Sequence, residues 1–359
     1  MNKNIKIHPI IDEDIDNILS EHLPWEKLKN KTVLVTGATG LIPSYIVHTL
    51  MRIDGINVIA LSRSEKKLKK KFDLYIQNQY FTYLPCDISA HIDLDTLFTH
   101  NAYIDIIFHG AGNTDRIGQK DIVNTINANI QGTRNCLELL KNQGEGVFIP
   151  FSSATIYGQS LKNKISEKDY GYTDLQAEDA PYVQSKRASE VYCYAYNKQF
   201  NVDIYIPRIS WVIGPEMNRD NGMRSDFLYN LIDGKNMVIR SNGKRILPFC
   251  YISDVVSAIF YILFYGKKAE PYNIVADDGN ISIEQFAELH KSIGNEKSKL
   301  IIKNEYNDGK PGISIDNRNL HSLGWHSKTT IKSGIQRIYN YMLSKHNCYE
   351  KNIYSYPLL

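Results

Sequence analysis

Short apolar runs alternate with longer helical stretches over the first two thirds of the chain, and this alternation constrains the fold more than any other feature. Such alternation predicts βαβ units and therefore a parallel, doubly wound α/β sheet of the Rossmann type. A sheet of this kind binds its ligand outside the carboxyl ends of its strands. The expected strands are 32–36, 57–61, 81–86, 104–109 and 147–151, and the expected helices are 44–52, 122–141 and 182–196.

The alternation loosens after Gly214, where we expect helices at 226–233, 254–265 and 283–293 with short strands between them. We therefore predict three parts. Residues 1–29 form an N-terminal extension, with a short helix at 12–22 in a strap packed on the main domain. Residues 30–213 form the Rossmann dinucleotide-binding domain with the catalytic helix. Residues 214–359 form mainly a smaller, partly interleaved α/β substrate-binding domain.

Composition narrows the class of protein. Hydrophobic residues make up 43% and charged residues 23% of the 359 positions, and the net charge is +3, which argues against a nucleic-acid partner. The longest apolar stretch, 255–265, is about half of what a membrane span needs, and no secretory leader opens the chain. Five scattered cysteines and the lack of H-E-x-x-H or H-x-x-x-H pairs predict no disulfide framework and no metal. We expect a cytoplasmic protein without membrane association, and a solvated helix face at the lysine-rich stretch 66–71.

A glycine-rich turn, T-G-A-T-G-L-I-P at 36–43, lies between the first strand and the first helix. Glycine permits a tight turn and lets backbone amides approach a pyrophosphate, which the helix N-terminus then stabilises. We assign Gly37, Gly40, Leu41 and Ile42 to the cofactor. Pro43 stands where a third small residue is expected, so we expect altered packing between helix and strand at that position.

The ends of the next strands complete the predicted dinucleotide site. Arg63 follows Ser62 where an acidic residue would grip a ribose 2′-hydroxyl, and an arginine there pairs with a 2′-phosphate. This pattern favours NADP over NAD, and the alternative is a surface arginine with the adenosine held elsewhere. Further cofactor contacts are predicted at Asp87, Ile88, Gly110, Ala111 and Gly112.

Tyr182 and Lys186 carry the sharpest chemical signal. Their spacing places both on one helix face, and a nearby ammonium lowers the pKa of a tyrosine below its usual value of about 10. Such a tyrosine exchanges a proton with a sugar hydroxyl or carbonyl near neutral pH. The strand before this helix ends in S-S-A-T-I-Y-G at 152–158, so a hydroxyl there can bond the reacting oxygen. Y-x-x-x-K alone is common, but this combination is specific.

Over roughly residues 31–340 the chain resembles the extended short-chain dehydrogenases/reductases of the NAD-dependent epimerase/dehydratase family, which act on nucleotide-activated sugars. The resemblance rests on T-G-A-T-G, C-D-I, F-H-G-A-G, N-I-Q-G-T, S-S-A-T-I-Y-G, Y-V-Q-S-K, Y-I-S-D and L-G-W in that order. It implies Tyr182 as acid/base, Lys186 on the nicotinamide ribose, Ser153 as hydroxyl partner, Thr155 on the sugar and Asn129 at the cofactor. It also implies a nucleotide-diphosphate sugar as substrate and homodimers through helices 122–141 and 182–196.

Three departures from the family pattern concern the substrate. Ala154 and Thr155 replace the Asp-Glu pair of the 4,6-dehydratases, which argues against dehydration. Leu247 replaces an arginine that many members place on the diphosphate, so we assign that role to Arg245, with Lys244 as the alternative. Trp211 replaces a common asparagine and is assigned to the substrate.

These observations predict oxidoreduction at a ring carbon, C4 of a hexose, of a nucleotide sugar. Arg63 favours a 4-keto-sugar reductase of deoxysugar or surface-polysaccharide biosynthesis that uses NADPH once. The S-A-T-I-Y-G motif instead favours a 4-epimerase with retained NAD, and decarboxylases share the same machinery. A non-catalytic nucleotide sensor is a weaker alternative, because Tyr182 and Lys186 are both present. A reductase of non-nucleotide substrates is also weaker, because Leu247 is the only feature that favours it.

Overall fold

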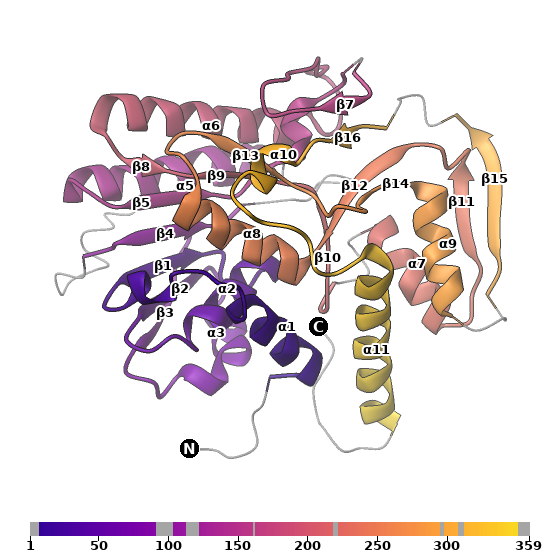
Figure 1. The fold of residues 1–359 in the computed structure, drawn as a ribbon, viewed down its shortest axis with the longest axis horizontal. Coiled ribbons are helices and arrows are strands. Elements are labelled where there is room, and N and C mark those ends of the chain that lie inside the picture. The colour runs from indigo at the N-terminus through magenta and orange to yellow at the C-terminus, as the bar shows by residue number, and fades with distance from the viewer. Residues whose placement is uncertain are drawn as a thin grey trace.

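A six-stranded parallel sheet organises the N-terminal half of the molecule in this computed structural model (Figure 1). The structure describes residues 7–90, 103–112, 122–160, 162–217, 222–294, 298–307 and 312–350. The strand order is β3-β2-β1-β4-β5-β8 and every neighbouring pair is parallel. The strands are β1 (Thr32–Thr36), β2 (Asn57–Ser62), β3 (Phe81–Pro85), β4 (Ile106–His109), β5 (Val147–Pro150) and β8 (Asp203–Ile204).

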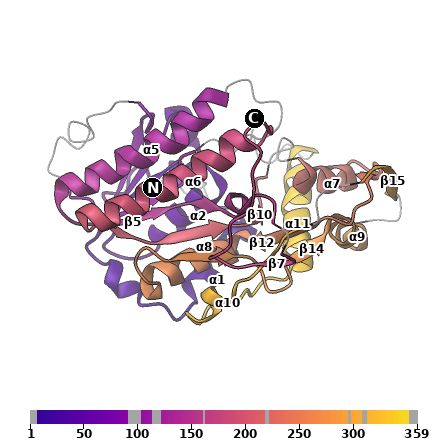
Figure 2. The same cartoon turned by 90° about the horizontal axis from the view of Figure 1, so that it is seen from above.

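Helices cover both faces of this sheet because its strands are apolar on both sides (Figures 1 and 2). Val33 and Val35 of β1 join one buried cluster, whereas Leu34 between them joins the other. The first cluster packs under α1 (Pro9–Leu19), α2 (Leu41–Leu50), α3 (Glu65–Lys71) and α8 (Ile252–Tyr265). The second packs under α5 (Ile122–Gln143) and α6 (Ala180–Phe200), which lie side by side. The predicted Rossmann-type α/β fold is confirmed.

Small sheets build the rest of the molecule. A three-stranded parallel sheet, β13-β9-β6, pairs β13 with β9, which in turn pairs with β6 from earlier in the chain. The remaining sheets are β10-β12-β14, β11-β15 and β16-β7. Their strands are β6 (Ser152–Ser153), β7 (Lys164–Ile165), β9 (Ile206–Ile209), β10 (Trp211–Ile213), β11 (Met237–Ser241), β12 (Ile246–Tyr251), β13 (Pro271–Ile274), β14 (Asn280–Ser282), β15 (Leu300–Tyr306) and β16 (Ser314–Ile315).

Helices α7, α9 and α11 pack around the β11-β15 side of the molecule (Figure 1). Their bounds are α7 (Met223–Ile232), α9 (Ile283–Ile293) and α11 (Ile331–Glu350), and the short α10 (Arg318–His321) precedes α11. Three 3₁₀ turns complete the description: η1 (Trp25–Leu28), η2 (Asp73–Tyr75) and η3 (Ala154–Tyr157). No helix among the described residues combines the length and apolar character that crossing a bilayer requires.

The N-terminal helix α1 is tied to both halves through one buried carboxylate. Asp14 is 1% exposed, and its Oδ2 accepts hydrogen bonds from Tyr45 on α2 at 3.0 Å and from Tyr251 at the end of β12 at 2.9 Å. Its Oδ1 accepts from the Arg337 guanidinium on α11 at 2.7 Å. The predicted strap is therefore a helix whose Asp14 carboxylate bonds to α2, β12 and α11.

The expected element bounds differ from the structure mainly at helix starts. Helix α1 begins at Pro9 rather than at 12, because proline suits a first helical turn and the His8 side chain accepts a hydrogen bond from the Ile10 amide. Helix α2 begins at Leu41 rather than 44, directly after Gly40. Strand β4 begins at Ile106 rather than 104. Helix α11 was not predicted at all.

Candidate active site

The carboxyl ends of β1 and β4 meet at one edge of the sheet, and the glycine-rich turn packs there. The Thr36 hydroxyl lies 2.8 Å from Nδ1 of His109 and accepts a hydrogen bond from the Ala111 amide at 3.1 Å. Gly37 has a φ of 65°, and a Cβ at this position would lie 2.7 Å from the Ala111 nitrogen. Glycine is therefore required here both for conformation and for the close approach of the segment after β4.

Helix α2 presents its N-terminus at this edge. Gly40 caps the helix without a side-chain hydrogen bond, so the first amides, those of Leu41 and Ile42, are available to an anion. A Cβ at Gly110 would lie 2.5 Å from Cγ of Pro43. The proline ring therefore occupies the space that Gly110 leaves, which is the altered packing expected at position 43. The turn fits a dinucleotide pyrophosphate.

The ends of β2 and β3 hold the residues assigned to the adenosine. The Ser62 hydroxyl lies 3.0 Å from that of Thr39, which links β2 to the glycine-rich turn. Arg63 is exposed. The Ser89 hydroxyl lowers the pKa of the Asp87 carboxyl, and the positive charge of Arg63 contributes to the same shift. The Ile88 side chain, in contrast, is buried in the cluster under α5.

Lys186 connects the catalytic helix to the strand end. Its ammonium donates a hydrogen bond to the carbonyl oxygen of Phe151 at 2.8 Å and lies 5.9 Å from the centre of the Tyr182 ring. A Cβ on Gly112 would lie 3.6 Å from the same nitrogen. The structure thus brings together Tyr182, Lys186 and the glycine segment after β4, as predicted.

Asn129 on α5 closes this side of the site. Its amide nitrogen donates to the Ser185 hydroxyl at 2.8 Å, whereas its buried Oδ1 has no hydrogen-bond partner among the described residues. A Cβ on Gly112 would approach this oxygen to 2.4 Å. A buried acceptor without a donor is costly, so the position suits a ligand that supplies one.

Ser153 is placed to donate a hydrogen bond. Its hydroxyl oxygen accepts hydrogen bonds from the Thr155 hydroxyl at 3.0 Å and the Thr155 amide at 3.3 Å. With its oxygen engaged as an acceptor, the Ser153 proton is left to point at a further acceptor. Thr155 thereby orients the neighbouring serine, a role that the sequence did not predict.

A buried ion pair under the strand end also escaped prediction. Glu190 lies eight residues after Tyr182, on the same helix face as Tyr182 and Lys186. Its carboxylate pairs with Arg208 at 2.7 Å and accepts a hydrogen bond from Ser152. Arg208 is fully buried on β9 and also donates to the Tyr157 hydroxyl at 3.0 Å. The sequence signal that could have indicated this ion pair is the charged residue eight positions after Tyr182.

His109 is held neutral beneath the site. Burial, assisted by the positive charge of Lys186, lowers the pKa of His109 to about 3. Its Nδ1 faces the Thr36 hydroxyl. The imidazole therefore packs β4 against β1 and does not exchange protons near neutral pH.

The residues assigned to the substrate lie on β10 and around the start of β12. The Arg224 guanidinium stacks over the Trp211 ring at 5.1 Å. Arg245 is exposed, whereas Lys244 pairs with Glu284 at 2.8 Å and Leu247 is buried. Lys244, the alternative cation for the diphosphate, is thus paired with a carboxylate.

Comparisons with known proteins agree with this geometry. Residues 33–275 match the model of the NAD dependent epimerase/dehydratase family. The chain is 28% identical over 312 residues to UDP-glucuronic acid decarboxylase 6 of Arabidopsis thaliana, covering 85% of this chain and 87% of that protein.

Two crystal structures share the fold, each covering 88% of this chain and 99% of the other. One is UDP-glucuronic acid 4-epimerase from Bacillus cereus in complex with UDP-glucuronic acid and NAD (23% identity, TM-score 0.74). The other is UDP-glucose 4-epimerase from Thermotoga maritima with UDP-glucose (21% identity, TM-score 0.75).

Proposed function

The chain belongs to the NAD dependent epimerase/dehydratase family, and on this premise we propose that it is a nucleotide-sugar 4-epimerase. The observation that carries the proposal is the strand end at Ser153, Ala154 and Thr155. Two hydrogen-bonded hydroxyls lie there, without the acidic pair that elimination of water needs. The fold is shared with sugar-nucleotide 4-epimerases from two bacteria, which supports the same reading.

The proposed mechanism assigns proton transfer to this chain's own residues. Tyr182 removes the proton of the sugar C4 hydroxyl and returns it after the sugar has turned over. Ser153, oriented by Thr155, donates a hydrogen bond to the same oxygen as it becomes a carbonyl. Lys186, fixed by the Phe151 carbonyl, places its positive charge beside the tyrosine. A bound nicotinamide supplies the redox step by accepting and returning hydride.

We propose NAD as the cofactor, rather than the NADP that Arg63 alone predicts. Asp87 lies close enough to Arg63 for its carboxyl pKa to respond to that charge, so the guanidinium is partly balanced and a 2′-phosphate would meet an anion. The proposed contacts are the α2 N-terminus, Ser62 and Arg63, Asp87 and Ile88, Gly110 to Gly112, Asn129 and Lys186. The Bacillus cereus epimerase was crystallised with NAD, which supports this choice.

We propose that the substrate is a nucleotide-diphosphate sugar, held mainly by residues 214–359. Trp211 and Arg224 form a cation–π pair that lines the sugar side, and Arg245 pairs with the diphosphate. Thr155 contacts the sugar ring. The curated plant relative decarboxylates UDP-glucuronic acid, and a uronic acid oxidised at C4 is a β-keto acid, which loses CO₂ readily. Decarboxylation is therefore the second candidate function.

The experiment begins with the purified full-length protein. We would denature it, identify any released dinucleotide by chromatography, and then incubate fresh protein with UDP-glucose, UDP-N-acetylglucosamine and UDP-glucuronic acid. Retained NAD and a C4 epimer of unchanged mass, seen by mass spectrometry and NMR, would support the epimerase. A product lighter by one CO₂ would assign a decarboxylase. No retained nucleotide, with stoichiometric consumption of NADPH by a 4-keto sugar, would overturn the proposal in favour of the reductase.

We also propose that two copies pair through α5 and α6. Val123, Ile126 and Val191 on these helices and Leu175 before α6 are exposed, with Val123 and Val191 about two-thirds exposed. Ile126, Leu175 and Val191, together with Ala180 and Ala188, line a groove between the helices. Light scattering on the intact protein tests this surface. A dimer that Val191→Glu converts to a monomer would support the pairing, and a wild-type monomer would contradict it.

A further inference from the structure

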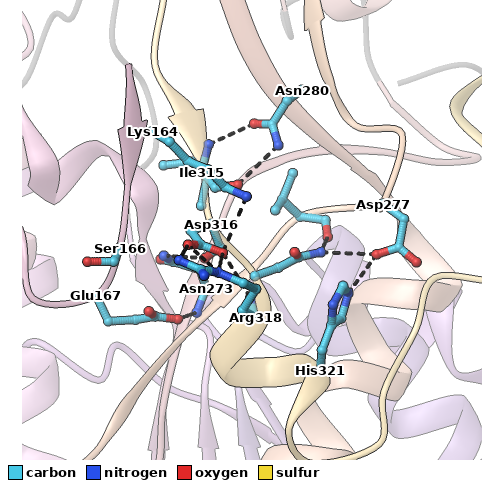
Figure 3. Close-up of polar contacts among 12 residues, drawn as sticks. Lys164, Ser166, Glu167, Asn273, Asp277, Asn280, Ile315, Asp316, Arg318 and His321 are labelled. Carbon is cyan, nitrogen blue, oxygen red and sulfur yellow. Dashed lines mark hydrogen bonds and ion pairs between the residues drawn. The ribbon is translucent and has the colours of Figure 1, made fainter. Parts of the chain in front are cut away.

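We propose that Asp277, His321 and His326 form a binding site for a divalent transition-metal ion, zinc by the chemistry of its donors. Within the part of the chain that the structure describes, one group of three histidine or carboxylate side chains places its ligand atoms within 4.8 Å of one another, and it is this group. Figure 3 shows Asp277 and His321 pointing toward each other. Two imidazoles and one carboxylate are a common zinc donor set.

Each oxygen of the Asp277 carboxylate faces a different imidazole. Oδ1 of Asp277 lies 2.7 Å from Nε2 of His321, and Oδ2 lies 3.5 Å from Nδ1 of His326. The two imidazole rings are 4.3 Å apart at an angle of 31°. Tetrahedral zinc with bonds of about 2.0–2.1 Å separates its ligand atoms by about 3.3 Å. The Asp277–His321 pair is about half an ångström closer than this, and no pair in the group is more than 4.8 Å apart, so side-chain adjustments of up to about 1.5 Å accommodate the ion.

Hydrogen bonds fix the segments that carry the three residues. Asp277 follows β13, and its carboxylate accepts a hydrogen bond from the Asn317 amide at 3.1 Å, which orients it. Trp325, between the two histidines in the chain, is fully buried and donates to the Ser257 hydroxyl at 3.0 Å. The Ser327 hydroxyl accepts from the Asp277 amide at 2.9 Å. The donors are thus presented by an ordered frame.

A metal ion here would link the segment after β13 to the end of α10 and the segment that follows it. The ion would take the place of the proton shared by Asp277 and His321, and water would fill the fourth position. Zinc binds the neutral form of an imidazole, so protons compete with the ion for these ligands. The sequence predicted no metal because His321 and His326 are five residues apart and Asp277 comes from elsewhere in the chain. The site uses none of the residues proposed for epimerisation.

The test uses full-length protein with its affinity tag removed and its metals stripped by a chelator. We would titrate it with Co²⁺, follow the visible absorption of the ion, and displace it with Zn²⁺. We expect one Co²⁺ per chain and a rise in the melting temperature with Zn²⁺. His326→Gln should weaken binding at least tenfold. That side chain is 64% exposed, so the metal-free variant should melt at the wild-type temperature.

His22→Gln is the matched control, because His22 is also an exposed histidine but lies outside the group. It should bind Co²⁺ like the wild type. The proposal is overturned if the wild type shows no saturable binding of one ion per chain, or if His326→Gln binds Co²⁺ and Zn²⁺ as tightly as the wild type. Either result would leave an ordinary hydrogen-bonded pair of Asp277 and His321. Neither bears on the epimerase assay, so the two proposals fail separately.

Discussion

The two halves of this molecule place their functional residues by different means. In the Rossmann half, one register row runs straight through the sheet from Val33 to Ile106 and Val147, so the strand ends converge on one edge. In the C-terminal half, short sheets of two or three strands carry Trp211 and Arg245, and the β11-β15 pair is interrupted by a register shift. In the Rossmann half the pairing of the strands thus brings the site residues together. In the C-terminal half their positions depend on the contacts of individual side chains.

We therefore expect the Rossmann half to carry out the reaction and the C-terminal half to select the substrate. In the proposed mechanism, proton transfer depends on Tyr182, Ser153 and Lys186, and a hydrogen bond to the Phe151 carbonyl fixes Lys186 at the strand end. The proposed recognition of the sugar nucleotide depends on exposed side chains such as Arg245, which directly precedes β12. Substitutions in the first region should therefore affect turnover, and those in the second should affect substrate affinity.

The largest expected effect is on turnover. Tyr182→Phe removes the proposed acid/base and should reduce kcat by about 10³-fold, within the usual range for a general base. Steady-state assays would measure kcat, with the nucleotide sugar that the product analysis identifies as substrate. Tyr192→Phe, on the same helix, is the control and should keep wild-type kcat. A loss below tenfold in Tyr182→Phe would remove the tyrosine from the mechanism.

The next effect tests whether the two halves unfold as one body. Asp14→Ala leaves the buried Tyr45 and Tyr251 and the partly buried Arg337 without their shared acceptor, which should destabilise the protein by about 3–5 kcal/mol in urea unfolding. Asp12→Ala on the same helix removes a half-exposed partner of Arg52 and should cost less than about 1 kcal/mol. Equal effects of the two variants would refute the role of Asp14 as a link.

A pH effect is expected in the Rossmann half. His109 has a folded pKa of about 3 against 6.5 unfolded, so its contribution to stability is present above pH 6.5 and is lost as the pH falls toward 3. At pH 5 this loss is about 2 kcal/mol. His109→Asn should flatten the stability profile between pH 6.5 and 5 by that amount, whereas His22→Gln should not. Parallel profiles for wild type and His109→Asn would contradict the neutral imidazole.

The smallest expected effect is on substrate affinity. Arg245→Ala removes the proposed diphosphate contact and should raise KM about tenfold with little change in kcat, as loss of one charged hydrogen bond implies. Lys244→Ala is the comparison, since Lys244 is already paired with Glu284 and should leave KM near wild type. If Lys244→Ala raises KM instead, the assignment of the two cations is reversed.

The sequence predicted the sheet and the catalytic face because both leave local signals. Apolar strands between helices mark the sheet, and the spacing of Tyr182 and Lys186 marks the helix face. Helix α11 also had a signal that was overlooked, since Ile331, Ile335 and Ile338 are buried at helical spacing. Strands of two residues, such as β6 and β7, are too short to show a period.

Other features had no local signal. The partners of Asp14 are 31, 237 and 323 residues away, and nothing near Asp14 marks it as buried. The same is true of Asp277 and its two histidines. Long-range pairings of polar groups depend on how the whole chain packs, so pattern and propensity do not reveal them.

The Asp14 contacts also set an order of events during synthesis. Helix α1 leaves the ribosome early, and Tyr45 follows soon after it, but Tyr251 and Arg337 are made hundreds of residues later. Until then the carboxylate has one of its three partners and gains by remaining in water. We therefore expect α1 to complete its docking only after the chain has been made as far as Arg337.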